Sequence, residues 1–191
     1  MKFLANSDAA NWCKAAPRSL TLREELIPSF GGMIAHSIKY EVPSDYFSIV
    51  QLLHHLLTLC TEGGFEGGMI WQLNWWSEKE SEKVTLKTID KIRQAYGELR
   101  PLEDAPACLV GTSELYDAIA LLVHPLQNTW AAQFVSVSGR CIMRSTVSGY
   151  LYFMLHDKET VDRVLERTAA WKPWQEIPGG FKQRESGERI P

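Results

Sequence analysis

The sequence lacks any long apolar stretch. Its longest apolar segments lie near residues 52–59 and 118–123, well short of the roughly 18 apolar residues that indicate a membrane-spanning helix. The first residues, MKFLANSD, contain one lysine and only a brief apolar run, whereas a signal peptide carries an apolar region of roughly 7 to 15 residues. We therefore expect a cytoplasmic protein that has no membrane partner.

An excess of one charge is also missing. Twenty Lys and Arg side chains against 23 Asp and Glu leave a formal net charge of −3, whereas proteins that bind nucleic acid usually carry a basic excess. We expect no nucleic-acid partner. The 191 residues suit one globular domain, which we place at 1–175. A loose C-terminal tail is expected over 176–191, where no apolar period is visible.

Paired cysteines and cofactor motifs are absent too. The four cysteines lie far apart, at Cys13, Cys60, Cys108 and Cys141. None forms the Cys-x-x-Cys spacing of metal and redox sites, so we expect free, buried thiols in a reducing compartment and no metal. The chain has no P-loop, GxGxxG, GxSxG, HExxH or EF-hand pattern. We therefore predict that it holds no cofactor.

Apolar spacing and turn residues predict a mixed α/β (α+β) fold of about six strands. Helices and strands alternate in the first two-thirds of the chain. Helices are expected at about 7–14, after Ser19 and ending before Pro28, 45–60 with Ser44 as its cap, 85–96, from 111–114 to His124, and 157–170. Strands are expected at 33–42, 69–76 (half-buried) and 107–110. Whether the strands form one sheet is left open.

The clearest local pattern lies in residues 130–155, which we predict to form a three-stranded antiparallel meander before the C-terminal helix. The tripeptide VSG occurs at 137–139 and again at 147–149. Two-residue turns at Ser138-Gly139 and Ser148-Gly149 would place Phe134 opposite Met143, and Met143 next to Met154. This pairing predicts a core face of Trp130, Phe134, Cys141, Met143, Val147, Tyr150, Tyr152 and Met154. The opposite face carries Gln133, Arg140 and Arg144, and is expected to lie under a helix or to meet a partner.

Three shorter features allow two interpretations each. GGMI occurs at 31–34 and 67–70 and indicates either a duplicated strand-helix unit or a coincidence. Gly111, Thr112 and Ser113 fit a helix cap or a phosphate site; without a following lysine, the cap is favoured. His54 and His55 are neighbours on a helix and cannot chelate one ion together, so we expect solvated or capping histidines.

Missing catalytic motifs, together with seven tryptophans, favour a non-catalytic protein-binding module, such as an accessory, adaptor or toxin-neutralising (immunity-type) protein. Tryptophan and arginine are the residues most often found at interface hot spots. The candidate binding residues are Trp76, Arg140, Arg144, Trp171 and Trp174. We expect the partner to be another protein.

Two other functions remain open. A small thiol-dependent hydrolase would use Cys13 as its nucleophile, His124 or His156 as the base, and Asp157 as the orienting carboxylate. A small-molecule sensor would need an aromatic-lined pocket. A deep cleft with Cys13 beside a histidine would favour the enzyme, and a flat aromatic patch would favour the binding module.

Overall fold

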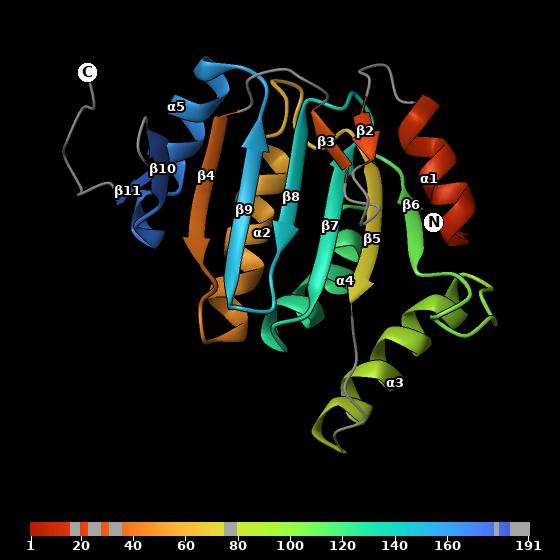
Figure 1. The fold of residues 1–191 in the computed structure, drawn as a ribbon. Helices are drawn as coiled ribbons and strands as arrows, with labels where there is room; N and C mark the ends of the chain where they lie inside the picture. Colours follow the sequence, from red (N-terminus) through yellow and green to blue (C-terminus); the bar gives the residue numbers. More distant parts are fainter. Residues whose placement is uncertain (16–19, 23–27, 31–35, 75–79, 178–179, 184–191) are drawn as a thin grey trace.

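A computed structural model describes residues 1–15, 20–22, 28–30, 36–74, 80–177 and 180–183. Its centre is one nine-stranded sheet in which every recorded pairing is antiparallel (Figure 1). In spatial order the strands are β1 (Lys2–Leu4), β6 (Ala107–Val110), β5 (Gly68–Asn74), β7 (Ala131–Ser136), β8 (Cys141–Ser145), β9 (Tyr150–Leu155), β4 (His36–Glu41), β10 (Trp174–Ile177) and β11 (Gly180–Gln183). A separate pair joins β2 (Leu20–Leu22) to β3 (Pro28–Phe30). The mixed α/β class is confirmed, whereas about six strands was an underestimate.

The described helices divide between the two faces of the sheet. They are α1 (Asn6–Ala15), α2 (Tyr46–Thr58), α3 (Glu80–Ala95), α4 (Leu115–Gln127), α5 (Lys158–Arg167) and a short 3-10 helix, η1 (Ala169–Trp171). Figure 1 shows α2 and α4 behind the sheet, and side chains of α2, α4 and α5 share the larger core with that face. None of the described helices is long and apolar enough to cross a membrane.

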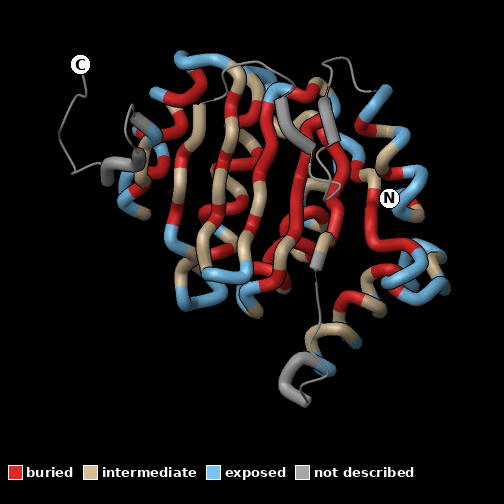
Figure 2. Tube along the Cα trace, viewed as in Figure 1, coloured by how far each residue is buried: buried red, intermediate tan, exposed pale blue. Residues whose placement is uncertain are grey.

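Helix α1 packs on the opposite face, at the β5–β6 end of the sheet. Its Cys13 joins Met69 and Trp71 of β5 in a second, smaller core, while Ile70 of β5 belongs to the larger one. Strand β5 is therefore buried on both faces, as the red tube in Figure 2 shows. The half-buried strand expected here was wrong, because α1 covers the second face.

The meander forms, but with one turn of different length. Phe134 lies opposite Met143, as predicted. The second turn has three residues instead of two, because the Thr146 N–H bonds to the Tyr150 carbonyl oxygen at 2.9 Å. Met143 therefore lies opposite Phe153, and the predicted neighbour Met154 was wrong.

This one-residue difference turns every side chain of β9 to the other face. Leu151, Phe153 and Leu155 are buried in the larger core, on the side of the helices. Tyr150, Tyr152 and Met154, predicted for the core face, lie on the opposite side and are half-buried. Val147, assigned to the same core face, is 63% exposed in the turn.

Several predicted helix ends need correction. Asp45, not Ser44, caps α2, since its carboxylate accepts a hydrogen bond from the Ser48 N–H at 2.8 Å. Helix α4 continues through the buried Pro125 to Gln127 rather than ending at His124. A proline inside a helix loses one backbone hydrogen bond and crowds the carbonyl group of residue i−4, yet α4 continues for two residues beyond the buried Pro125.

Two expected helical segments also differ. Strand β2 lies where a helix was expected to begin after Ser19; residues 23–27 of that segment are outside the described residues. Helix α3 begins earlier than predicted, at Glu80, and ends at Ala95, so Tyr96 lies just after its end and is 40% exposed. The chain turns away at Gly97, whose φ is 79°, so Tyr96 lies beyond the packed face of the helix.

Strands β10 and β11 extend the sheet into the segment expected to be a loose tail. Trp174 of β10 pairs with Lys39 of β4, and β11 pairs with β10. Residues 178–179 and 184–191 of the predicted tail lie outside the described part of the chain.

The second GGMI motif has a structural explanation. Gly67 has a φ of 81°, and a Cβ there would lie 2.5 Å from the Val110 carbonyl oxygen. A Cβ at Gly68 would lie 2.3 Å from the Val135 carbonyl oxygen. Both glycines are required because neighbouring strands approach β5 closely. The first GGMI copy, at 31–34, is outside the described residues.

Candidate binding surface and polar pocket

One row of side chains crosses five strands on the sheet face opposite α2, α4 and α5. Directly paired positions align Gln133 of β7, Arg144 of β8, Tyr152 of β9, Lys39 of β4 and Trp174 of β10. We call these five residues the cross-sheet row. Directly opposite residues on one face have Cβ atoms about 4.5–5.5 Å apart, so the row is a continuous strip that mixes cationic and aromatic side chains.

The outer part of the row is organised around Lys39. Its Nζ atom lies 3.6 Å from the ring centroid of Tyr150 and 5.0 Å from that of Trp174. A cation over an aromatic face is attracted by the ring quadrupole. The two rings therefore hold the ammonium group at the sheet surface, and all three side chains are half-buried.

The inner part contains buried polar atoms without partners. Gln133 has no exposed surface, and neither its Nε2 nor its Oε1 has a hydrogen-bond partner. The Nε of Arg144 is likewise buried and unpaired. No ion pair between Arg144 and another described residue is recorded. Unsatisfied buried polar groups cost about 1–3 kcal/mol each. Gln133 is out of a partner's reach because it has no exposed surface, whereas Arg144 is half-buried and accessible in part.

Charge on this part of the sheet is of one sign. Residues 130–155, which form the whole meander, contain Arg140 and Arg144 but no Asp or Glu. Among the described strand residues that point to this face, the acidic ones are Glu41 and Glu176, on the outer strands β4 and β10. The centre of the row is therefore positive within a chain of net charge −3.

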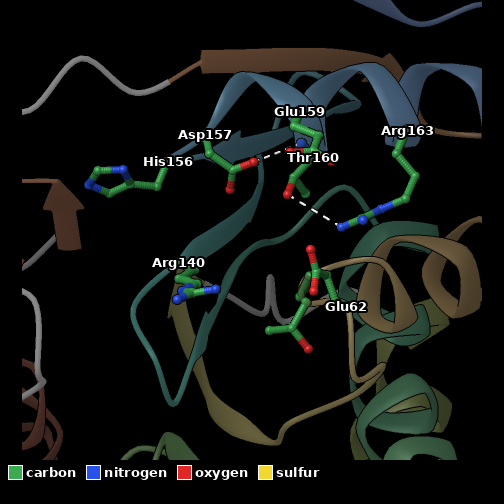
Figure 3. A pocket seen from close by; sticks show the side chains of 9 residues that line it. Glu62, Arg140, His156, Asp157, Glu159, Thr160 and Arg163 are labelled. Carbon is green, nitrogen blue, oxygen red and sulfur yellow. Dashed lines mark hydrogen bonds between the residues drawn. The ribbon is translucent and has the colours of Figure 1, made fainter.

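A polar pocket of about 300 Å³ lies at one end of the sheet (Figure 3). It forms where the chain after α2, the start of β8 and the start of α5 meet. Its charged and polar lining includes Glu62, Arg140, His156, Asp157, Thr160 and Arg163. The pocket thus brings together three of the predicted site residues: Arg140, His156 and Asp157.

Asp157 has a structural task in this pocket. Its carboxylate accepts a hydrogen bond from the Thr160 N–H at 2.8 Å and caps α5. Burial raises the pKa of Asp157, but the hydrogen bonds from Thr160 and the charges of Arg163 and Arg140 lower it more, so the pKa lies below its usual value. The carboxylate is therefore ionised near neutral pH. Figure 3 shows the His156 ring directed away from Arg163 and Glu62.

The proposed thiol nucleophile lies elsewhere. Cys13 is fully buried, and burial raises its pKa to about 11, which keeps it protonated at neutral pH. It packs on the α1 side of the sheet, whereas His124 belongs to α4 on the other side. Burial lowers the pKa of His124. Cys13 is not among the residues that line the polar pocket beside His156.

The predicted tryptophans have separate positions. Trp171 and Trp174 are half-buried and line an open groove of about 340 Å³ beside Glu41 and Lys172. The Trp171 ring meets the His55 ring edge-on, with 5.5 Å between centroids, so His55 is half-buried rather than solvated. Trp76 lies outside the described residues.

Two other sequence features resolve into ordinary structure. The N-cap position of α4 is Glu114 without a side-chain cap bond, so a cap at Thr112 or Ser113 was wrong. The Glu114 carboxylate instead accepts the Gly111 N–H at 2.7 Å, which occupies a donor that a phosphate would need. Among the described residues, no group of three or more His, Cys, Asp and Glu could hold a metal ion.

Comparison with protein-family models, with curated proteins and with solved structures gave no match to this chain. Function is therefore inferred from the surface and the pocket themselves. Sequence reasoning missed Lys39 of the cross-sheet row, assigned Tyr152 to the wrong face, and missed Glu62 and Arg163 of the pocket. The acid-free run over 130–155 was the visible signal for the row; no local pattern marks the pocket.

Proposed function

We propose that this protein is a non-catalytic protein-binding module that uses the cross-sheet row to bind an acidic surface of a partner protein. The observation that carries this proposal is a pair of cations on either side of Tyr152: Arg144, whose Nε has no hydrogen-bond partner, on a meander without acidic residues, and Lys39 on the neighbouring strand β4. Carboxylates on a partner would supply the missing charge and hydrogen bonds. Accessory, adaptor and toxin-neutralising proteins all act through surfaces of this kind.

The chemistry of the row suits an interface. Arginine, tyrosine and tryptophan are enriched at hot spots, where they are surrounded by residues that exclude water. Arg144, Tyr152 and Trp174 are half-buried and stand on paired strands, so little side-chain freedom would be lost on binding. Lys39, held between two rings, adds a second pre-positioned cation.

A binding role also has more support than a thiol hydrolase. A catalytic cysteine needs a lowered pKa and a base within hydrogen-bond reach. The Cys13 pKa is raised by burial. Cys13 packs on the α1 side of the sheet, whereas His124 belongs to α4 on the other side and His156 lines a pocket whose lining does not include Cys13. The row, by contrast, presents two half-buried cations, Lys39 and Arg144, beside aromatic side chains, a combination typical of interfaces.

The test compares partner capture by the wild-type chain and by Arg144→Ala and Trp174→Ala, each checked for an unchanged melting temperature. Arg167→Ala, at the exposed end of α5, is the matched control. A captured protein is identified, purified and titrated against each chain. We expect each row variant to weaken binding by about thirtyfold, equivalent to ~2 kcal/mol, and the control to bind as the wild type does.

Salt and the nature of the partner provide the second readout. Binding should weaken as ionic strength rises, because charges at an interface rim are screened, and the bound surface should be acidic. The proposal fails if no stoichiometric partner is found, or if both row variants retain full affinity. Loss of a measurable turnover in Cys13→Ala would favour the thiol hydrolase instead.

A further inference from the structure

The polar pocket contains opposite charges that face one cavity without pairing. Arg140 comes from the start of β8, Arg163 from α5, and Glu62 from the chain after α2. Figure 3 shows the three side chains around the same hollow. In this described region, Glu62 forms no ion pair with either arginine. Arg163 donates only a long hydrogen bond, 3.3 Å, to the Thr160 hydroxyl.

Two of the pocket's carboxylates belong to the start of α5. Asp157 is used as the cap of this helix, and Glu159 lies in its first turn. Arg140 and Glu62 are exposed and Arg163 is half-buried, so all three are accessible to a ligand in the cavity. The cavity of about 300 Å³ is at the small end of the range for small-molecule sites, roughly 300–1,000 Å³.

We propose that this pocket binds a small zwitterion of the α-amino acid type. The ligand carboxylate would accept hydrogen bonds from the guanidinium groups of Arg140 and Arg163. The ligand ammonium group would donate to the Glu62 carboxylate. Charge-assisted hydrogen bonds are roughly twice as strong as neutral ones. A ligand that carries both charges would pair with the two arginines and with Glu62.

The charge balance argues against a simple anion. Three carboxylates line the pocket, from Glu62, Asp157 and Glu159, against two arginines. A phosphate dianion would meet more negative than positive charge, and like charges disfavour each other in a confined site. A zwitterion carries no net charge and avoids this repulsion, provided that its ammonium group lies toward Glu62.

The experiment is calorimetric titration of the full chain with each standard L-α-amino acid. For any that binds, the matching amine without the carboxylate and the matching acid without the amine are titrated next, followed by inorganic phosphate. We expect at least one amino acid to bind and its two halves and phosphate to bind at least about tenfold more weakly, because each half loses one set of charged contacts.

Charge-neutral variants assign the contacts. Arg163→Gln and Glu62→Gln should each weaken binding of the amino acid by at least about tenfold. Arg167→Gln and Asp162→Asn, on α5 but outside the pocket lining, should leave the affinity unchanged. Arg144→Ala, in the cross-sheet row, should also retain it, which separates this proposal from the proposed protein-binding function.

The inference is overturned if no amino acid binds up to about 10 mM, a concentration at which even weak sites fill. It is overturned equally if phosphate or a half-ligand binds as tightly as the zwitterion. Unchanged affinity in both Arg163→Gln and Glu62→Gln would place any bound amino acid outside this pocket.

Discussion

Two neighbouring aromatic residues of β9 test the register on which the cross-sheet row depends. Phe153 lies opposite Met143, has no exposed surface and faces the helices. Tyr152 lies opposite Arg144 on the other face and is half-buried. A shift of the β8–β9 pairing by one residue would exchange the two positions. Replacing each aromatic with alanine therefore reads out which face it occupies.

The expected costs differ severalfold. Phe153→Ala should lower the free energy of unfolding by about 3–5 kcal/mol, the usual cost of removing a buried aromatic ring. Tyr152→Ala should cost about 1 kcal/mol, a typical value for a point mutation. Urea unfolding followed by circular dichroism measures both. With a slope of roughly 2–3 kcal/mol per molar urea, the midpoint should fall by more than about 1 M for Phe153→Ala.

Val137→Ala is the control, because Val137 is 47% exposed in the first meander turn; its unfolding free energy should stay within about 0.5 kcal/mol of wild type. The reasoning is refuted if Tyr152→Ala costs as much as Phe153→Ala or more. Such costs are expected for the two-residue turn at Ser148-Gly149, which would place Tyr152 on the helix side and Phe153 on the other face.

Two further predictions concern a cap and the thiols. Asp157→Ala should lose about 1 kcal/mol of stability at neutral pH. Because the folded-state pKa of Asp157 is lowered, this contribution is present above its usual value of 3.8 and disappears as the pH falls below it; equal wild-type and variant stabilities at neutral pH would contradict the cap. All four cysteines are free and buried, and a thiol reagent should count four in denaturant without reductant but react slowly with the native chain. Fast native labelling of Cys13 would contradict its raised pKa.

Elements with a strong local pattern were predictable from the sequence. The C-terminal helix predicted at 157–170 forms as α5, and the apolar spacing that predicted it corresponds to the buried Val161, Val164 and Leu165. The strand at 107–110 matches β6, and the first meander turn sets Phe134 opposite Met143. In each case the spacing of apolar residues, or a turn dipeptide, determines the structure within a few residues.

The order of the strands was not predictable, because it depends on contacts between distant segments. Strand β4 lies between β9 and β10, two strands that come more than a hundred residues after it in the chain. Strands of three or four residues, such as β1 and β10, are too short to show a period. They form because a neighbouring strand offers free backbone groups.

The burial of Arg93 could not be predicted from the sequence either, because it also depends on distant segments. Its position on α3 gives no sign of burial, yet it is 1% exposed. Its Nη2 donates to the carbonyl oxygens of Arg100 and Pro101 at 3.0 and 3.3 Å. The Phe3 ring lies 5.3 Å from the guanidinium carbon. The loop after α3 and strand β1 supply these partners, and neither is visible in the helical pattern.

The candidate binding surface depends on the length of one turn. The face of Arg144, predicted to lie under a helix or to meet a partner, does not depend on the length of the second turn, because the first meander turn sets it. With a two-residue second turn, Arg144 would stand beside Leu151, Phe153 and Leu155, an apolar face that a helix would need to cover. The three-residue turn instead places Tyr152 beside it, with Lys39 next in line. A single additional turn residue therefore converts an apolar face into a cationic and aromatic one, and the affinity lost in Arg144→Ala and Trp174→Ala tests that face directly.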